Sequence, residues 1–149
     1  MIIDKDLELC LATTLDTGTA GADLAGNVIR TQRINMNLAV GRPMYCVIRV
    51  DTAVTSGGSA TVTFALRSDD AAAVHVSTST LHASTPAIAV ATLVAGYTRI
   101  LTLPPGVYEE YLGLIVTSAT ADLTAGKIDA WITDNVSQWV STADALSAP

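Results

Sequence analysis

Apolar and polar residues alternate in three segments of the chain, as they do in β-strands with one buried face. In residues 44–51 and 60–67 every second position, starting from Met44 and Ala60, carries an apolar side chain. A Ser-Gly-Gly-Ser turn at 56–59 separates the two segments. We therefore predict that these segments form a β-hairpin. Residues 127–133 show the same alternation and predict a further strand near the end of the chain. The apolar set of this last segment is Ile128, Ala130 and Ile132.

The segment from Leu93 to Val116 contains two apolar stretches on either side of a stiff turn. Residues 97–103 and 111–117 are rich in the β-branched, aromatic and large aliphatic residues that strands favour. Pro-Pro-Gly at 104–106 lies between them. Proline fixes φ and has no N–H to donate, whereas glycine accepts positive φ. The pattern predicts a strand, an exposed turn and a second strand.

Five other segments have weaker patterns. Residues 7–15 alternate leucine with polar or small residues, which predicts a strand, although the helix propensity of Leu and Ala makes a helix the alternative. Residues 16–27 are predicted to be a loop, and residues 28–34 a short edge strand. Residues 69–85 are rich in Ser, Thr and Ala, so we expect them to lie outside the core and to begin with one helical turn. Residues 88–93 predict another short strand.

Short strands with turn residues at intervals of about ten residues are typical of sandwiches and jelly rolls. The spacing of alternating strands and helices that would indicate a parallel sheet is absent from the sequence. We predict an all-β fold, an antiparallel β-sandwich of jelly-roll type, with an irregular C-terminal tail. The domain is expected to span residues 1–133 and the tail residues 134–149, since 149 residues suffice for one core.

The charge of the chain limits the classes of partner. A formal net charge of −6 argues against general binding to nucleic acid or to an anionic membrane, because both require a positive surface. No apolar run approaches the roughly 20 residues that span a bilayer, and Met1–Asp6 lacks the basic start of a signal peptide. We therefore expect the protein to stay in the cytoplasm, with Cys10 and Cys46 as buried free thiols.

The sequence offers few residues with which to build an active site. The histidines, His75 and His82, fall in the Ser- and Thr-rich segment, where we expect exposed loop residues; a hydrolase would need one of them beside a nucleophile. Asp69 and Asp70 lack the alternating oxygen ligands of a calcium loop, which favours a role in a turn. Glu109–Glu110 is expected to be a solvated charge pair. We predict no enzyme activity, no metal and no cofactor.

Two groups of residues are candidates for binding. The window from Leu24 to Val50 contains no acidic residue, although the chain as a whole is acidic. Its positive charges are Arg30, Arg33, Arg42 and Arg49. They form either a scattered solvated face or a contact for an acidic partner. Trp131 falls on the polar side of its predicted strand, so either the tail with Trp139 covers it or an interface buries it.

Seven short blocks of the sequence carry a family resemblance. They are Met1–Lys5, Gly41–Tyr45, Val50–Ala53, Leu66–Asp70, Leu93–Tyr97, Leu103–Gly106 and Tyr111–Leu112. In their order and spacing they resemble the small jelly-roll capsid cement (decoration) proteins of tailed bacteriophages. The resemblance covers most of the chain up to about Thr133. The chain departs from the family in a longer 16–27 loop and in the extension after Asp134.

The resemblance implies a jelly roll that forms a homo-oligomer, a dimer or a trimer, on the outer surface of the capsid. It implies a virion protein that is made in the bacterial host cytoplasm and clamps neighbouring major capsid protein subunits, without catalytic residues. We expect the contacts to come from the N-terminal residues, the arginine window and the tail after Asp134. The residues expected at capsid or subunit contacts are Arg30, Arg33, Arg42, Trp131 and Trp139.

An alternative function belongs to a different class of protein. A carbohydrate- or receptor-binding β-sandwich of a phage particle would use exposed aromatic rings as platforms for sugars. Only 5% of the residues are aromatic, but Tyr108, Tyr111 and Trp131 are candidates for a small platform. Binding in a glycan array would favour this alternative over the capsid-binding hypothesis.

Overall fold

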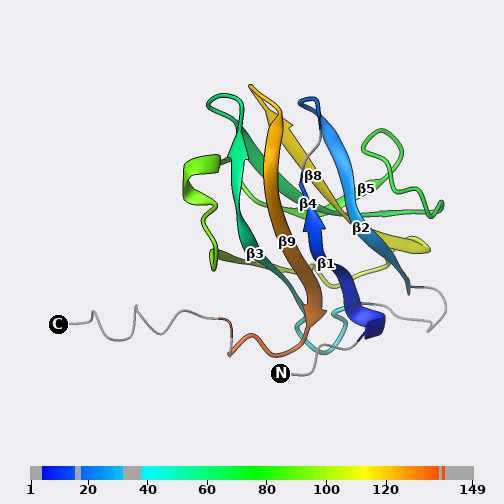
Figure 1. The fold of residues 1–149 in the computed structure, drawn as a ribbon. Helices are drawn as coiled ribbons and strands as arrows, with labels where there is room; N and C mark the ends of the chain where they lie inside the picture. Colours follow the sequence, from blue (N-terminus) through cyan, green and yellow to red (C-terminus); the bar gives the residue numbers. More distant parts are fainter. Residues whose placement is uncertain (1–4, 16–17, 32–37, 138, 140–149) are drawn as a thin grey trace.

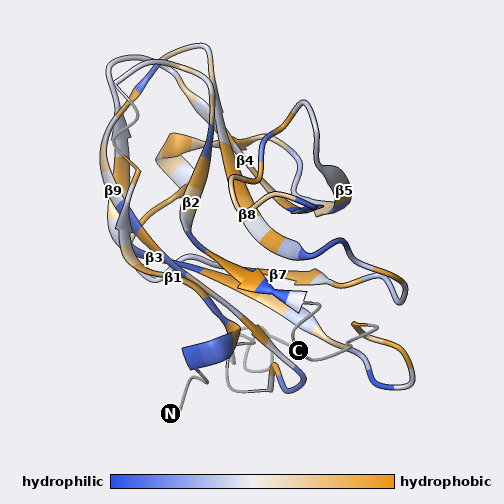
Figure 2. Ribbon diagram, turned by 90° about the vertical axis from the view of Figure 1, so that its right-hand side faces the viewer, coloured by the Kyte–Doolittle hydropathy of each residue, from blue (hydrophilic) through white to orange (hydrophobic). Residues whose placement is uncertain are grey.

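The computed structural model describes residues 5–15, 18–31, 38–137 and 139. Two antiparallel sheets pack face to face, and Figure 2 separates them into one layer with β9 and β3 and another with β4, β8 and β5. The first sheet has the order β1 (Glu8–Thr14), β9 (Leu123–Thr133), β3 (Tyr45–Ser56) and β7 (Thr98–Thr102). The second sheet has the order β2 (Ala22–Arg30), β8 (Tyr111–Ala119), β4 (Thr61–Asp69) and β5 (Thr80–Ser84), with β6 (Ile88–Ala89) paired to β4.

This order is that of a jelly roll. Most connections cross from one sheet to the other, so that sequence neighbours such as β1 and β2, or β7 and β8, lie in different layers. Figure 1 traces the path of the chain through the sandwich. The predicted all-β antiparallel sandwich is therefore confirmed. The described residues include two short 3₁₀ turns, η1 (Lys5–Leu7) and η3 (Val90–Thr92). Neither is long and apolar enough to cross a membrane.

Hydrophobic side chains from both sheets fill the space between the layers. The predicted alternation is confirmed in β3, β4 and β9, where every second residue is buried in one common core. The fully buried members of these three sets include Cys46, Ile48, Val50, Val62, Phe64, Leu66, Ile128 and Ala130. Cys10 and Cys46 are free and buried, as predicted. Burial raises the pKa of the Cys10 thiol to about 12, which keeps it protonated and unreactive.

The predicted hairpin of residues 44–51 and 60–67 is wrong. These segments form β3 and β4, which lie in opposite sheets and face one another across the core. β3 pairs instead with β7 and β9, whereas β4 pairs with β5, β6 and β8. The alternation therefore identified the buried face of each strand correctly, but alternation carries no information about which strand lies alongside.

The predicted loop over residues 16–27 is wrong for its second half. β2 begins at Ala22, pairs with β8 and lies at the edge of its sheet. The edge strand predicted at residues 28–34 is confirmed for residues 28–30, whereas residues 32–34 lie outside the described residues. Glycine here marks a close approach of two strands rather than a loop. Gly26 has a φ of +71°, and a Cβ at this position would lie 2.4 Å from the Cβ of Cys10 on β1. The register of β2 shifts between Ala25 and Ile29 around this residue.

The prediction that residues 69–85 lie outside the core is largely confirmed, because most of them are exposed and none belongs to the buried core cluster, against which only Ala83 of this segment packs. The segment contains β5, however, and Val74 in the β4–β5 connection is only 3% exposed. The expected helical turn at its start is absent from this described segment. The Asp69 carboxylate instead accepts hydrogen bonds from the Thr78 hydroxyl at 2.6 Å and from the Ala71 N–H at 3.2 Å, and so closes the loop. These bonds lower the pKa of Asp69.

Residues 7–15 contain a strand, as predicted, and the helical alternative is limited to the η1 turn. Their alternation is irregular, however, because the register between β1 and β9 shifts twice. Cys10 is buried whereas Leu11 is 58% exposed, and Ala12 has a positive φ of 46°. The strand predicted at 88–93 is confirmed only for β6, which η3 follows.

Candidate interaction surfaces

The outer face of the first sheet carries an apolar row. Val47 of β3 lies opposite Trp131 of β9 on one side and opposite Ile100 of β7 on the other. Trp131 is only 4% exposed and Val47 is fully buried, although both point away from the core between the sheets. The ring of Trp139 packs edge-on against Trp131, with the centroids 4.5 Å apart. The two tryptophans are therefore in contact, and Trp139, in the described part of the tail, covers Trp131 of β9.

The arginines of the acid-free window do not form one patch. Arg30 ends β2, on the edge of the second sheet, and its Nε donates to the Glu110 carboxylate at 2.6 Å. Arg42 precedes β3 and pairs with Asp134 at 3.0 Å, whereas Arg49 lies opposite Asp129 on the first sheet. Arg33 lies outside the described residues. Acidic residues from the second half of the chain thus oppose the described arginines, which sequence order alone does not reveal.

Arg30 is held from two sides. Its guanidinium forms an ion pair with Glu110 and lies 5.7 Å from the centroid of the Tyr111 ring. The hydrogen bond and the charge of Glu110 raise the pKa of Arg30. The backbone beside it is also joined, because the Thr31 N–H donates to the Glu110 carbonyl at 2.8 Å. The end of β2 is thereby fixed to the start of β8.

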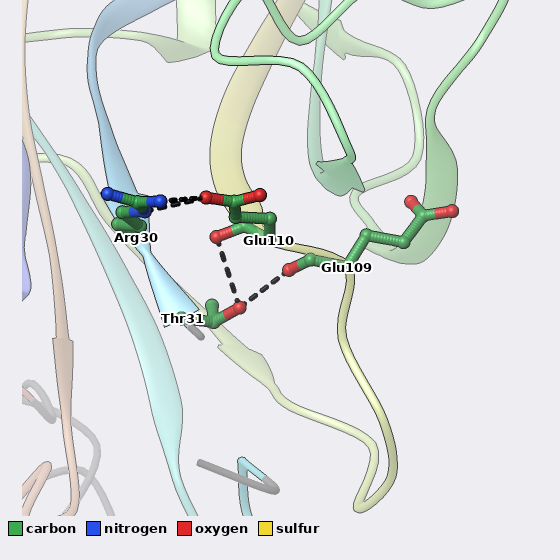
Figure 3. A network of polar contacts seen from close by, with 4 residues as sticks. All are labelled: Arg30, Thr31, Glu109 and Glu110. Carbon is green, nitrogen blue, oxygen red and sulfur yellow. Dashed lines mark hydrogen bonds and ion pairs between the residues drawn. The ribbon is translucent and has the colours of Figure 1, made fainter. Parts of the chain in front are cut away.

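Glu109 and Glu110 bind the segment between β7 and β8 to β2, β4 and β5, and Figure 3 shows the contacts on the β2 side. We call this segment, residues 103–110, the 103–110 loop. The Thr31 hydroxyl donates to the Glu109 carbonyl at 2.5 Å, and the two carboxylates point to opposite sides. The Glu109 carboxylate accepts from Ser68 of β4 at 3.1 Å and from Thr80 of β5 at 3.2 Å. The expected solvated charge pair is therefore wrong, because both carboxylates are bonded to the protein.

His82 belongs to this network and is not an exposed loop residue, contrary to our expectation. It lies on β5, and its Nε2 is 2.6 Å from the fully buried Ser68 hydroxyl. Its ring stacks on Tyr108 with the centroids 3.9 Å apart. Burial lowers the pKa of His82, against the opposing effect of the Glu109 charge. Burial also raises the pKa of Tyr108 to about 12.

The grouping of Ser68, His82 and Glu109 differs from a hydrolytic triad. In a triad the carboxylate orients the histidine, and the serine is open to substrate. Here the Glu109 carboxylate accepts from Ser68 itself, the Glu109 N–H donates to the same hydroxyl at 3.2 Å, and Ser68 has no exposed surface. The Ser68 hydroxyl thus links β4 to the His82 side chain and to both the side chain and the backbone of Glu109. These hydrogen bonds hold the end of the 103–110 loop in place.

A hollow of about 490 Å³ lies between η1, the start of β1 and β2. It is lined by Lys5, Asp6, Glu8, Asn27, Val28, Ile29 and Arg30. The charges there are of both signs, and Lys5 pairs with Glu8 at 3.1 Å. Within the described ranges, no group of three or more His, Cys, Asp or Glu side chains is placed to hold a metal ion.

A family model named Bbp16 matches residues 14–132. The match runs from the end of β1 to the penultimate residue of β9, which is well over half of the chain. The chain belongs to the Bbp16 family. Within this family match lie Arg30, Arg42, Trp131 and the whole 103–110 loop, whereas Trp139 lies beyond it. A comparison with curated proteins finds no match.

Proposed function

We propose that this Bbp16-family protein is a structural virion protein that binds the outer surface of a phage capsid. In this role it stabilises the shell by bridging neighbouring major capsid protein subunits, without catalysis or a cofactor. The protein is made in the bacterial host cytoplasm and binds the shell as a homo-oligomer. The proposal rests on the resemblance of the sequence blocks to capsid cement proteins.

The observation that supports the proposal most is where these blocks lie in the fold. Gly41–Tyr45 leads into β3, Leu66–Asp70 ends β4, Leu93–Tyr97 leads into β7 and Leu103–Gly106 leads out of it. These four blocks therefore lie where the chain enters or leaves strands of one jelly roll, whereas Val50–Ala53 lies within β3. This is the distribution expected when a resemblance reflects a shared fold with its connections, rather than scattered similarity in composition.

The physical properties of the molecule agree with a cementing role. A rigid sandwich with internally braced connections loses little conformational entropy when it binds. Weak contacts repeated around a symmetric shell add through multivalency, so each copy needs only a small contact area at each point. A net charge of −6 also disfavours loss of the protein to nucleic acid released in the host.

The alternative of a carbohydrate-binding sandwich has less support. Of the rings expected to form a sugar platform, Tyr108 and Trp131 are each only 4% exposed. Tyr108 is stacked on His82, and Trp131 is packed against Trp139. Tyr111 alone is left partly exposed, beside the Arg30 guanidinium. A single ring is a weak platform for a sugar.

Co-sedimentation tests the proposal. Purified protein is mixed with mature capsids that lack it, and the shells are pelleted and heated. We expect saturable binding at micromolar protein or below and a higher temperature of shell disruption. Protein that stays in the supernatant while the same sample binds in a glycan array would contradict the proposal and favour the carbohydrate-binding alternative.

A further inference from the structure

The tip of the 103–110 loop is apolar and exposed. Pro104 and Pro105 are exposed, and Val107 is 84% exposed, the highest value among the large hydrophobic side chains in the described residues. The sequence from Ile100 to Tyr108 contains no charged residue. Single exposed hydrophobic residues are common on protein surfaces and need no explanation. The tip is unusual because of how firmly its base is held.

Both ends of the loop are anchored in the core. Leu103 and Tyr108 are 1% and 4% exposed, and the Leu103 N–H donates to the Met44 carbonyl at 2.9 Å. The Tyr108 hydroxyl turns back and donates to the Pro104 carbonyl at 2.7 Å. Gly106 pairs with Leu38 in an isolated antiparallel bridge. The two prolines further restrict the backbone, so the tip has a defined shape before any partner binds.

A second group of contacts braces the same loop from outside. Tyr108 stacks on His82, Glu109 binds Ser68 and Thr80, and Glu110 pairs with Arg30. β2, β4 and β5 therefore all hold one connection, which Figure 3 shows for the β2 side. This bracing keeps the apolar tip outside the core, although burial of Val107 would be favourable for the folded chain. A fixed, exposed apolar tip is the property of a binding loop.

From this geometry we infer that the tip formed by Pro104, Pro105 and Val107 inserts into an apolar pocket on another protein. Resting on the proposed function, the inference assigns that pocket to a major capsid protein subunit. The tip has no charge, so its complement is apolar rather than basic. A stable dimer would need about 20–30 residues on each side, which a three-residue tip does not supply. A small anchor repeated around a shell is sufficient, because each pocket adds to the avidity.

The test compares two matched variants, V107D and V94D. Val94 is 55% exposed and lies before the start of β7, whereas Val107 lies beyond its end. Both substitutions place a carboxylate on an exposed site, so both variants are expected to fold, which circular dichroism and thermal unfolding check. We expect V107D to weaken binding to capsids by about tenfold or more. V94D is expected to bind within about twofold of the wild type, as usual for surface changes.

The outcomes separate the inference from the proposed function. Wild-type protein that fails to bind capsids contradicts the proposed function itself. Wild-type binding with an unchanged affinity of V107D overturns the inference alone. The same holds if V107D and V94D weaken binding equally, since the effect would then be one of added charge. Conversion of an oligomer to a monomer by V107D, seen in sedimentation velocity, would assign the tip to self-association and also overturn the inference.

Discussion

The indole of Trp139 packs edge-on against the indole of Trp131, with 4.5 Å between the ring centroids. The contact joins the last strand of the jelly roll to a residue six positions after it ends, and it covers the outer face of the first sheet. Aromatic pairs of this geometry contribute about 0.5–1.5 kcal/mol beyond the area they bury. The Trp139 side chain therefore contributes to the stability of the folded domain.

W139A is expected to expose Trp131 and to lower the free energy of unfolding by about 1 kcal/mol or more. The variant retains one tryptophan, so its fluorescence reports Trp131 directly and is expected to shift to longer wavelength. W139F serves as the control, because a phenyl ring preserves most of the cover. An unshifted spectrum of Trp131 in W139A would contradict this role of Trp139.

S68A is expected to lower the free energy of unfolding by about 1–3 kcal/mol, since it leaves the partly buried Glu109 carboxylate and His82 without their shared partner. S118A is the matched control. Ser118 is also buried, but its hydroxyl bonds only the Gly21 backbone, at 3.2 Å from the amide nitrogen. Chemical denaturation of both variants measures the difference. Equal losses would argue against a special role for the Ser68 network.

Stability is expected to depend on the protonation of His82. Its pKa is lowered by burial in the folded state, so the unfolded chain takes up the proton first as the pH falls below the ordinary value of 6.5. The free energy of unfolding should therefore decrease as the pH falls from about 7.5 to about 5.5. H82Q should flatten this dependence. The lowered pKa of Asp69 acts only below its ordinary value of 3.8, outside this window. An identical slope in H82Q and the wild type would refute the assignment.

G26A is expected to destabilise the protein more than G18A. Both glycines have positive φ, +71° and +62°, so both variants bear the roughly 1–2 kcal/mol cost of a left-handed alanine. Only at Gly26 does the new Cβ meet other atoms, at 2.4 Å from Cys10 and 2.6 Å from the Leu9 carbonyl. The difference between the two unfolding free energies measures the approach of β2 to β1. Equal losses of unfolding free energy in G26A and G18A would show that β1 and β2 move apart at no cost to admit the alanine side chain.

The contacts expected from the sequence are tested by one combined variant. Removal of residues 135–149 together with R30A, R33A and R42A should weaken capsid binding by roughly tenfold or more, because several points of a multivalent contact are lost. R99A, which removes a positive charge from the exposed Arg99 of β7, is the control. Undiminished binding of the combined variant would remove the arginine window and the tail from the contact surface.

Period-two alternation was sufficient to predict the fold class and the buried face of β3, β4 and β9. It could not predict that β3 and β4 lie in opposite sheets, because pairing depends on the path of the connections rather than on the face of each strand. The start of β2 was missed since its glycine and small residues resemble a loop. Gly26 is there because β1 passes too close for a side chain.

The candidate site was less predictable than the fold. Ser68 occupies an inward position in the alternation of β4, so a buried polar residue was detectable from the sequence. Its partners were not, because Glu109 is 41 positions away and His82 reaches it only through the pairing of β4 with β5. The acidic partners of the described arginines could not be predicted for the same reason. Glu110 is 80 positions from Arg30 and meets it only when β2 and β8 pair.

Cryo-electron microscopy of capsids reconstituted with the purified protein tests the central claim most directly. We predict ordered density for a jelly roll at symmetry-related sites on the outer surface, bridging neighbouring capsid subunits, with the 103–110 loop directed into the shell. Reconstituted shells without such density at saturating micromolar protein would contradict the proposed function. Ordered density with the loop directed into solvent would keep the function and reject the assignment of Val107.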